Sequence, residues 1–337
     1  MVYQDGNMGV ICYGSENFRT SFRQAIEAKF DPSVLIDFTD ETFSNKELYT
    51  AVDENVRRRN IYVVMNFTGY DDDFDPNIPY MRLFITNDAL MRARAGEIND
   101  VLPFMPYLRQ ERKDRPRSPI SAALFAKLLK ASGATSLTTV DMHTAAIEGF
   151  YDMPVNHLSA MSVIGDRLVE GYDINADDWV LVSPDAGSMQ RTRDMKAYLS
   201  QKHNLDLRIA MTEKTHGRGG ETEVTYVVGD VNGLNVIQID ELIDTAGTSG
   251  EGATKLRTKG ARDIIAGGTH GLFSRKKDRA AEDRIRDAGI KVISTDSIPR
   301  SDEFLDENKD WLDVVSLGPL TAEAIYRDHK GDSVSSL

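Results

Sequence analysis

Apolar residues in this chain gather in short runs that alternate with longer stretches of mixed character. Nearly continuous apolar runs of this length are typical of strands buried in a parallel sheet. Stretches of about 10–15 residues with helical spacing separate the runs, and this alternation predicts βαβ units. The runs predict strands at 9–14, 34–38, 60–66, 100–107, 136–141, 179–183, 207–211, 223–228, 236–241, 263–267 and 291–295. The stretches between them predict helices at 16–30, 80–95, 120–131, 161–171, 191–202, 251–259 and 319–326.

The alternation of strands and helices pauses near residues 150–160 and then starts again. A chain of 337 residues is long enough for two domains of ordinary size. We therefore predict an α/β protein with two similar domains, 8–155 and 156–318. Each domain is expected to be a mainly parallel sheet flanked by helices.

One stretch combines a strand end with unusual chemistry. The predicted strand at 236–241 closes on two adjacent carboxylates, Asp240 and Glu241. The loop that follows, 244–250, is rich in Gly, Thr and Ser and leads into a predicted helix. Such a loop directs backbone N–H groups at one point, which suits a phosphate. Carboxylates repel phosphate. We therefore expect the acidic pair to bind sugar hydroxyls or a metal that accompanies the phosphate. A plainer alternative is that Thr245 or Thr248 only caps the helix.

Other predicted strands also end in polar side chains, and ligands of open α/β sheets bind beyond the carboxyl ends of the strands. Arg109 and Gln110 begin a charged segment, 109–117, which is equally typical of a solvated surface run. His143 is compatible with a structural histidine, and Asp185 with a helix cap. These alternatives do not explain why four strand ends carry such residues, and that favours a binding site.

The charge and the cysteine content narrow the function further. The formal net charge is −13, so the chain lacks the basic face that nucleic acids require, and we predict no nucleic-acid partner. The single cysteine, Cys12, excludes an internal disulfide and fits a reducing compartment. We find neither an export signal nor an apolar run near the length of a membrane span. These features predict a soluble, cytoplasmic protein without a membrane partner.

Several motifs taken together resemble those of the ribose-phosphate diphosphokinases, which are also called phosphoribosyl pyrophosphate (PRPP) synthetases. The resemblance covers nearly the whole chain from Gly9 onward. A single motif would suit any protein that binds PRPP, whereas the full set in this order is specific. The motifs are Phe43-Ser44-Asn45-Lys46-Glu47, the segment 105–122, Asp141-Met142-His143, and the segments 147–150, 236–248, 269–274 and 333–335.

The resemblance implies an enzyme that transfers the β,γ-diphosphoryl group of ATP to the 1-hydroxyl of ribose 5-phosphate and releases AMP. It implies Mg²⁺ as the cofactor and ATP and ribose 5-phosphate as partners. It also implies two phosphoribosyltransferase-like domains, with the C-terminal segment 319–332 packed on the first. The expected assembly is a homo-oligomer based on dimers, up to a hexamer. Chemistry of this kind is mostly positioning and electrostatics, so no nucleophilic side chain is needed.

Each candidate residue receives a role from the resemblance. The implied ATP site consists of Phe43, Asn45, Glu47, Arg109, Gln110 and Asp114, the last reaching across a subunit contact. The implied ribose 5-phosphate site consists of Asp240, Glu241, Asp244, Thr245, Ala246, Gly247 and Thr248. The implied Mg²⁺ ligands are His143 and Asp185. The implied catalytic residues are Lys214, His143 and Arg218, with Lys214 on a predicted mobile glycine-rich loop at 214–220.

The chain departs from the family pattern at several positions. His216 stands where the family has an arginine after the loop lysine, and a histidine is only partly charged near neutral pH. Glu241 replaces an Asp, and Ser188 replaces a Gly. Many members have Gln at the two positions that are here Ala146 and Glu148, in a segment linked to phosphate activation.

Three hypotheses follow: an active synthetase, a non-catalytic regulatory homologue, and a phosphoribosyltransferase that consumes PRPP. His216 and the altered segment support the second hypothesis, and only the motif at 236–248 supports the third. The complete motif set, with Lys214, His143, Asp185 and the acidic pair all present, favours the first.

Overall fold

The computed structural model describes residues 6–67, 75–216, 222–276, 279–335 and 337. The chain divides into two compact units. Unit 1 consists of Met1–Ser159, Ser297–Pro299 and Ser316–Leu337, and unit 2 consists of Ala160–Asp296 and Arg300–Val315. The C-terminal segment therefore belongs to the same unit as the N-terminal segment. Among the described residues, none of the helices combines the length and the apolar character needed to span a membrane.

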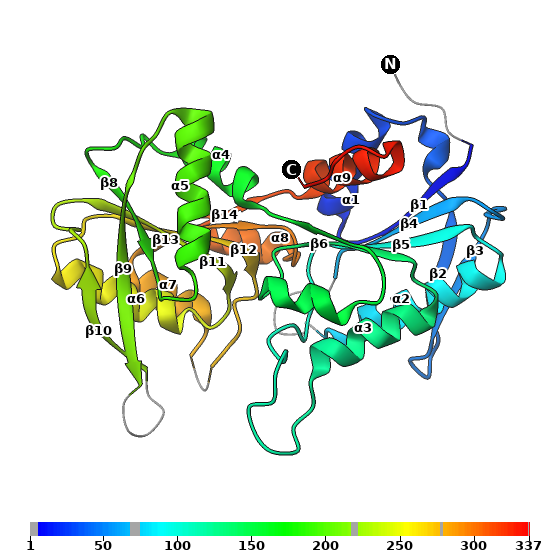
Figure 1. The fold of residues 1–337 in the computed structure, drawn as a ribbon, viewed down its shortest axis with the longest axis horizontal. Helices are drawn as coiled ribbons and strands as arrows, with labels where there is room; N and C mark the ends of the chain where they lie inside the picture. Colours follow the sequence, from blue (N-terminus) through cyan, green and yellow to red (C-terminus); the bar gives the residue numbers. More distant parts are fainter. Residues whose placement is uncertain (1–5, 68–74, 217–221, 277–278, 336) are drawn as a thin grey trace. The chain divides into compact units, whose positions relative to one another are not determined.

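Unit 1 is built on a five-stranded sheet in which every pair of neighbouring strands is parallel. The order across the sheet is β1-β4-β5-β6-β7, so the chain adds each new strand on the same side (Figure 1). Apart from the edge strand β7, the strands are almost entirely buried, as expected for a parallel sheet covered on both faces. Their bounds are β1 (Met8–Tyr13), β4 (Asn60–Met65), β5 (Glu97–Leu102), β6 (Ser136–Val140) and β7 (Val155–Leu158).

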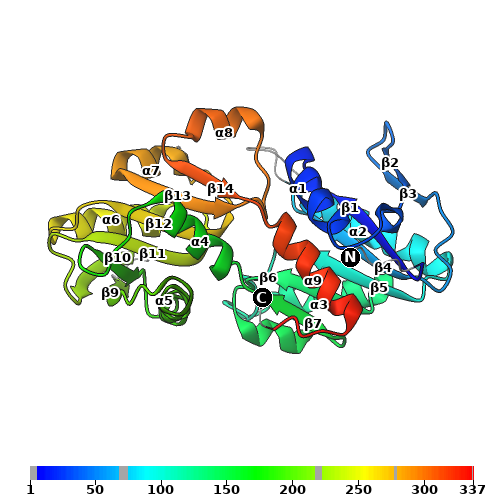
Figure 2. The same ribbon diagram turned by 90° about the horizontal axis from the view of Figure 1, so that it is seen from above.

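Helices cover both faces of this sheet, α1 with α9 on one and α2 with α3 on the other (Figures 1 and 2). Phe18, Phe22 and Ile26 recur every four residues and are the buried face of α1. The α9 backbone approaches α1 closely, because a Cβ at Gly318 would lie 2.7 Å from the Phe22 amide nitrogen. Only glycine fits there. The bounds are α1 (Glu16–Glu27), η1 (Pro32–Val34), α2 (Asn77–Arg92), α3 (Ser121–Ser132), η3 (Ala145–Phe150) and α9 (Gly318–Lys330).

Unit 2 is built on a seven-stranded sheet with the order β10-β9-β8-β11-β12-β13-β14. All neighbouring strands are parallel except β9 and β10, which are antiparallel. The helices are α4 (Met161–Gly171), α5 (Met189–His203), α6 (Gly247–Thr258), α7 (Ala281–Ala288) and α8 (Asp302–Asn308). The strands are β8 (Trp179–Ser183), β9 (Arg208–His216), β10 (Thr222–Val228), β11 (Asn235–Ile243), β12 (Ile264–Gly271), β13 (Ile290–Thr295) and β14 (Leu312–Val315).

The strand order of unit 2 reverses between β8 and β11. From β8 the chain proceeds outward to β9 and β10, and it then returns to place β11 on the other side of β8. In open α/β sheets such a reversal marks the place where ligands bind, beyond the carboxyl ends of the two strands. The predicted fold class is confirmed, since each unit has a mainly parallel sheet flanked by helices.

Several predicted elements differ from the structure. The predicted strand at 34–38 is wrong: η1 occupies its start, and β2 (Phe38–Thr42) pairs with β3 (Leu48–Val52) in a separate hairpin. Pro32 fixes the helical turn, and the Asp31 side chain caps it by accepting from the Ser33 N–H at 3.0 Å. An apolar run alone does not reveal this cap.

Three other boundaries also shift. The strand predicted at 100–107 begins earlier and ends at Leu102, because Pro103 and Pro106 lack the N–H that a ladder needs. Of the glycine-rich loop predicted at 214–220, the first three positions belong to β9, which extends to His216, and the others lie outside the described residues. The helix predicted to start at residue 251 starts at Gly247.

Candidate functional site

Three carboxylates of unit 2 gather at the strand-order reversal. Asp185 follows β8, and Asp240 and Glu241 lie near the carboxyl end of β11. The Asp185 Oδ1 atom accepts from the Ser188 N–H at 2.8 Å, which ties it to the residue just before α5. The Ser188 hydroxyl in turn donates to Asp240 Oδ1 at 3.4 Å. A single short loop therefore holds Asp185 beside the acidic pair.

The surroundings of Asp240 oppose its negative charge. Burial raises the pKa of this carboxyl well above its usual range, and the neighbouring carboxylates of Glu241 and Asp185 raise it further. The Glu241 N–H donates to Asp240 Oδ1 at 2.9 Å and partly offsets this effect. Buried like charges are costly unless a counter-charge joins them. The group is therefore suited to receive hydrogen-bond donors or a cation.

Arg191, on the first turn of α5, supplies part of that counter-charge. Its Nη1 atom lies 3.2 Å from Glu241 Oε2, and both side chains are largely buried. The sequence analysis missed this residue. Its position six residues after Asp185, in the first turn after the loop, was the available signal, because helix residues near that end face the same strand ends.

The loop after β11 leads directly into α6. Ala246 adopts a left-handed backbone conformation, with φ 52° and ψ 14°, and Gly247 is the first helical residue. The N–H groups of the first helical turn have no partner within their own helix. Asp244, Thr245, Ala246, Gly247 and Thr248 are thereby brought together at a helix N-terminus, the arrangement that suits a phosphate.

The three residues of the predicted glycine-rich loop that can carry positive charge are Lys214, His216 and Arg218. Lys214 and His216 lie in β9, in antiparallel register with Val224 and Thr222 of β10, and we describe only their backbone. Arg218 lies outside the described residues. The proposed catalytic lysine is thus carried by a strand next to β8, not by a loop.

The predicted purine-binding residues lie in unit 1 at the turn of the β2–β3 hairpin. The Phe43 N–H donates to the Glu47 carbonyl at 2.8 Å, and the Glu47 N–H donates to Asn45 Oδ1 at 3.1 Å. Phe43, Asn45 and Glu47 are all exposed. The Phe43 ring is 45% exposed and lies 5.9 Å from the Tyr49 ring, centroid to centroid. An exposed aromatic ring at a hairpin turn is free to stack on a planar ligand.

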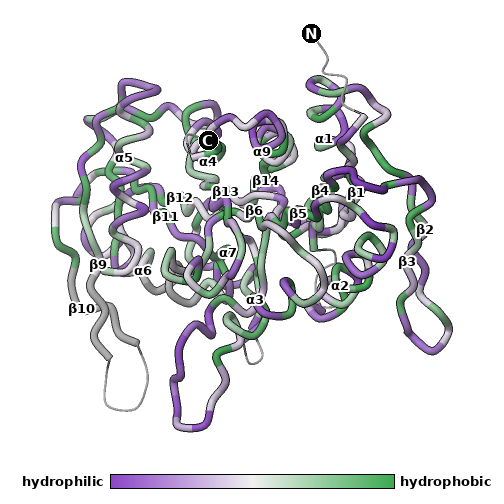
Figure 3. The backbone as a smooth tube through the Cα atoms, turned by 45° about the vertical axis from the view of Figure 1, so that its right-hand side comes forward, coloured by the Kyte–Doolittle hydropathy of each residue, from purple (hydrophilic) through white to green (hydrophobic). Residues whose placement is uncertain are grey.

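The segment with the predicted phosphate-binding arginine leads into α3. It is strongly hydrophilic, as Figure 3 shows for the loop before α3. Arg109, Gln110 and Asp114 are exposed. Gln110 is anchored because its Oε1 atom accepts from the Ser121 hydroxyl at 2.7 Å. Asp114 lies 3.9 Å from Arg112, with both side chains mostly in solvent.

His143 is half-buried and follows β6, where Asp141 has a positive φ of 41°. A neighbouring histidine, His157, holds this turn. Its Nε2 atom accepts from the Met142 N–H at 2.9 Å, and its Nδ1 atom lies 2.7 Å from Glu148 Oε1. Because Nε2 accepts, the proton is on Nδ1, which donates to Glu148. The sequence analysis missed His157, which no local pattern distinguishes.

The described residues contain no group of three or more His, Cys, Asp or Glu side chains arranged to hold a metal ion. Mg²⁺ seldom uses such a closed group, since it retains water and binds through one or two carboxylates together with substrate phosphates. Asp185, held beside two other carboxylates, is the kind of open oxygen ligand that this chemistry needs. The residues of unit 2 therefore fit Mg²⁺ as a cofactor shared with a phosphorylated substrate.

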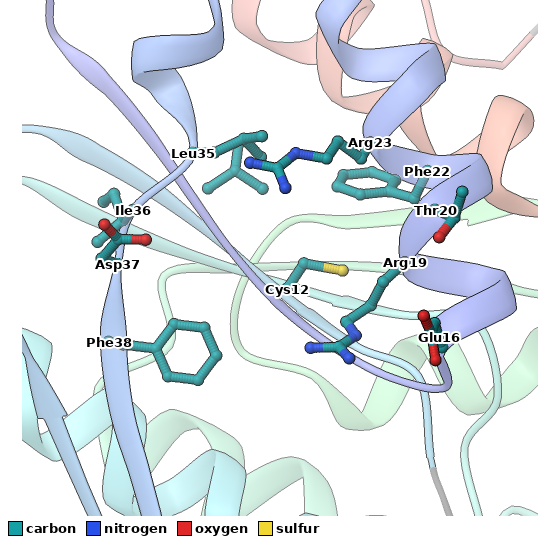
Figure 4. Close-up of a pocket in the computed structure, with 11 residues that line it drawn as sticks. Cys12, Glu16, Arg19, Thr20, Phe22, Arg23, Leu35, Ile36, Asp37 and Phe38 are labelled. Atoms are coloured by element: carbon teal, nitrogen blue, oxygen red, sulfur yellow. The ribbon is translucent and has the colours of Figure 1, made fainter.

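Unit 1 also contains a pocket that none of the predicted site residues line. It has a volume of about 360 Å³ and lies between α1 and the segment 35–38 (Figure 4). Arg19 and Arg23 line it together with Glu16 and Asp37, so its charges are mixed and select no class of ligand. Cys12 lies at its base, where burial raises the pKa of the thiol to about 12.

Comparison with known proteins gives a consistent result. Residues 12–133 match the family described as the N-terminal domain of ribose phosphate pyrophosphokinase, and residues 206–337 match the phosphoribosyl synthetase-associated domain. A ribose-phosphate pyrophosphokinase from Aquifex aeolicus is 38% identical over 304 residues, which is 90% of this chain and 91% of that protein. The chain belongs to the ribose-phosphate pyrophosphokinase family.

Other members of the family agree. The enzyme of that name from Bacillus subtilis is 38% identical over 297 residues, 88% of this chain and 87% of that protein. The crystal structure of phosphoribosylpyrophosphate synthetase from Mycobacterium smegmatis matches with a TM-score of 0.81 and 32% identity. That match covers 96% of this chain and 99% of the other. The predicted family is therefore confirmed, and so is the predicted architecture.

Proposed function

We propose that this chain is an Mg²⁺-dependent ribose-phosphate diphosphokinase that makes PRPP and AMP from ATP and ribose 5-phosphate. One observation carries the proposal. In unit 2 an acidic pair and a helix N-terminus adjoin the strand-order reversal, and ribose 5-phosphate offers vicinal hydroxyls and a phosphate at the matching ends of one molecule. Family membership supports the same assignment.

On the ribose side, Asp240 and Glu241 accept hydrogen bonds from the 2- and 3-hydroxyls. The loop from Asp244 to Thr248 binds the 5-phosphate through backbone and hydroxyl donors, and Ala246 and Gly247 contribute backbone N–H groups. Two anchors at opposite ends of the sugar fix its orientation and leave the 1-hydroxyl to react. The acidic pair accepts charge-assisted hydrogen bonds, which are stronger than neutral ones.

On the nucleotide side, Phe43 stacks on the adenine, and Asn45 and Glu47 bond to its edge. Arg109 binds phosphate oxygens with its fork of donors, and Gln110 supports it. Exposure of these groups is consistent with a site that closes around ATP. Asp114 reaches the nucleotide of a neighbouring subunit.

In the reaction the ribose 1-hydroxyl oxygen forms a bond to the β-phosphorus of ATP and gives up its proton to solvent. The bond from that phosphorus to the oxygen that it shares with the α-phosphorus breaks, and AMP leaves with this oxygen. Lys214 and Arg218 supply positive charge to the transferred group, and His143 assists it. His143 and Asp185 would hold Mg²⁺, which would supply further charge neutralisation.

We propose that the protein works as a homo-oligomer in the cytoplasm, where ATP is available. Apolar side chains of α2 and α3 stand about half exposed on the surface of unit 1, and a second copy of the chain is a suitable cover. These side chains are Ile78, Met81, Met91 and Leu124, with Leu128 somewhat less exposed.

The test is AMP release from ATP and Mg²⁺, with and without ribose 5-phosphate. We expect release that depends on ribose 5-phosphate, with an equal amount of PRPP. Lys214→Ala should lose about 100-fold or more in rate, the effect of removing one donor to a transition-state charge. Lys255→Ala, an exposed lysine of α6, is the control and should be unchanged. No ribose-dependent AMP from the wild type at any phosphate concentration would favour a non-catalytic homologue.

A further inference from the structure

The carbonyl groups that precede α6 are all held by neighbouring elements. The segment 272–274, at the end of β12, donates to the Ile243 carbonyl at 2.9 and 3.1 Å and to the Asp244 carbonyl at 3.0 Å. The next carbonyl, that of Thr245, accepts from Nη1 of Arg284 at 2.9 Å. This contact is made by a side chain, whereas the preceding ones are made by the backbone. Arg284 is therefore the residue that fixes the last peptide before the helix.

Arg284 is well placed for this role. It lies on α7, which packs beside α6, and its side chain is half-buried. Its second arm, Nη2, donates to the Lys276 carbonyl at 2.9 Å. A guanidinium group has a rigid planar fork, so two carbonyls bound at once fix its orientation. The Thr245 carbonyl is thus tied to the segment after β12.

The N–H group of Ala246, which follows this carbonyl, indicates that a ligand binds here. Every peptide bond among the described residues is trans, so the Ala246 N–H faces away from the Thr245 carbonyl and hence away from Arg284. Ala246 is only 4% exposed, and its N–H has no hydrogen-bond acceptor among the described residues. Buried backbone N–H groups nearly always have a partner. This one directly precedes the first turn of α6, whose N–H groups are also available.

We propose that Arg284 is a positioning residue for the ribose 5-phosphate site. It holds the Thr245–Ala246 peptide in the orientation that presents the Ala246 N–H, together with the first turn of α6, to the 5-phosphate. The proposal rests on the proposed function of the chain. Arg284 itself does not touch the substrate; it acts through the peptide that it bonds.

Loss of Arg284 has a specific consequence. Rotation of the Thr245–Ala246 peptide would turn a carbonyl oxygen toward the phosphate and remove one donor. Ala246 already occupies the left-handed region, which costs energy for any residue but glycine. When the hydrogen bond from Arg284 to the Thr245 carbonyl is lost, we expect the loop to move to a less strained conformation. The expected result is weaker binding of the 5-phosphate of ribose 5-phosphate, with the affinity for ATP unchanged.

The experiment compares Arg284→Met with the wild type. Calorimetry should show that Arg284→Met binds ribose 5-phosphate about tenfold more weakly than the wild type, or weaker still. This is the effect expected when one hydrogen bond to a charged group is lost. Kinetics should show a matching rise in the KM for ribose 5-phosphate, with kcat and the KM for ATP within about twofold. A merely structural role would lower kcat and alter both KM values. Arg284→Lys keeps the charge but bonds one carbonyl at a time, so it should show a smaller rise in the same KM.

Arg286→Met is the control, because Arg286 lies on the same helix and bonds the Glu307 carbonyl and Asn308 instead. It should bind ribose 5-phosphate like the wild type. Equal affinity in wild type, Arg284→Met and Arg284→Lys would overturn the proposal. If Arg284→Met does not fold, Arg284→Lys alone decides, and unchanged affinity overturns it. A wild type that fails to bind ribose 5-phosphate would instead refute the proposed function.

Discussion

The two units share an architecture but use their strand ends differently. In unit 1 the strand order runs in one direction, and the predicted nucleotide residues lie on the β2–β3 turn and on the segment before α3. In unit 2 the order reverses between β8 and β11, and the predicted ribose-phosphate residues lie at the reversal itself. The predicted sugar half is thus formed by the sheet, whereas the predicted nucleotide half is carried by segments that project from it.

The contacts follow the same division. Asp240 and Glu241 are held by Ser188 and Arg191; Glu241 is buried and Asp240 is half-buried. Phe43 and its neighbours at the turn are exposed and are bonded to one another. A site held in place by packed elements loses little conformational freedom when its ligand binds, whereas an exposed segment must be ordered by the ligand. We therefore expect mutations to act differently in the two halves.

The largest effect is expected in the sugar half. Asp240→Ala should lower kcat/KM for ribose 5-phosphate by about 100-fold, since it removes charge-assisted bonds to a hydroxyl. The KM for ATP should change much less. The exposed Asp206, whose side chain is 77% exposed beside Lys196, provides the control Asp206→Asn. Steady-state kinetics with each substrate varied in turn measure the difference, and equal losses in both variants would contradict the comparison.

A smaller effect is expected in the nucleotide half. Phe43→Ala should raise the KM for ATP by about tenfold, because stacking of one base on an aromatic ring contributes about 1–3 kcal/mol. Phe43→Tyr keeps the ring and should resemble the wild type. Neither change should alter the melting temperature appreciably, because the ring is already exposed. A melting temperature that falls in Phe43→Ala would show that the turn is part of the packed structure.

The smallest effect on activity is expected at Asp100, a carboxylate buried in the core of unit 1. Burial raises its pKa to about 8, and its hydrogen bond from Asn87, 3.0 Å long, only partly offsets this. The folded state therefore keeps a proton that the unfolded state releases above its ordinary pKa near 4. The free energy of unfolding is highest below that pKa and falls as the pH rises through about 8.

Asp100→Asn removes this titration. Between pH 5 and pH 8 the wild type should lose up to about 1.4 kcal/mol of stability per pH unit relative to the variant. Urea unfolding of both proteins across that range measures the difference, in which all shared titrations cancel. Activity at pH 7 should agree within about twofold. Parallel pH profiles would show that Asp100 is ionised in the folded protein.

The order of buried strands was predictable from the sequence, because fully buried parallel strands are continuous apolar runs, whereas several strand ends were not. The acidic pair and the loop after it were recognisable for the same reason. The hairpin at 38–52 was not, since its two short strands pair only with each other and carry no buried run. Arg284 was also not predictable, because its partner, the Thr245 carbonyl, lies 39 residues away and has no side-chain signature.

The close contact between α1 and α9 has a consequence for synthesis on the ribosome. Just after α1, Phe30 packs against Tyr326 and His329 of α9, and Lys29 forms an ion pair with Glu323. All of unit 2 is translated between these two helices. At a rate of about 5–20 residues per second, the apolar face of α1 waits roughly 15–60 s for its cover. Chaperones that shield aromatic surface on nascent chains have that interval in which to act, and unit 1 reaches its final packing only after unit 2 has emerged.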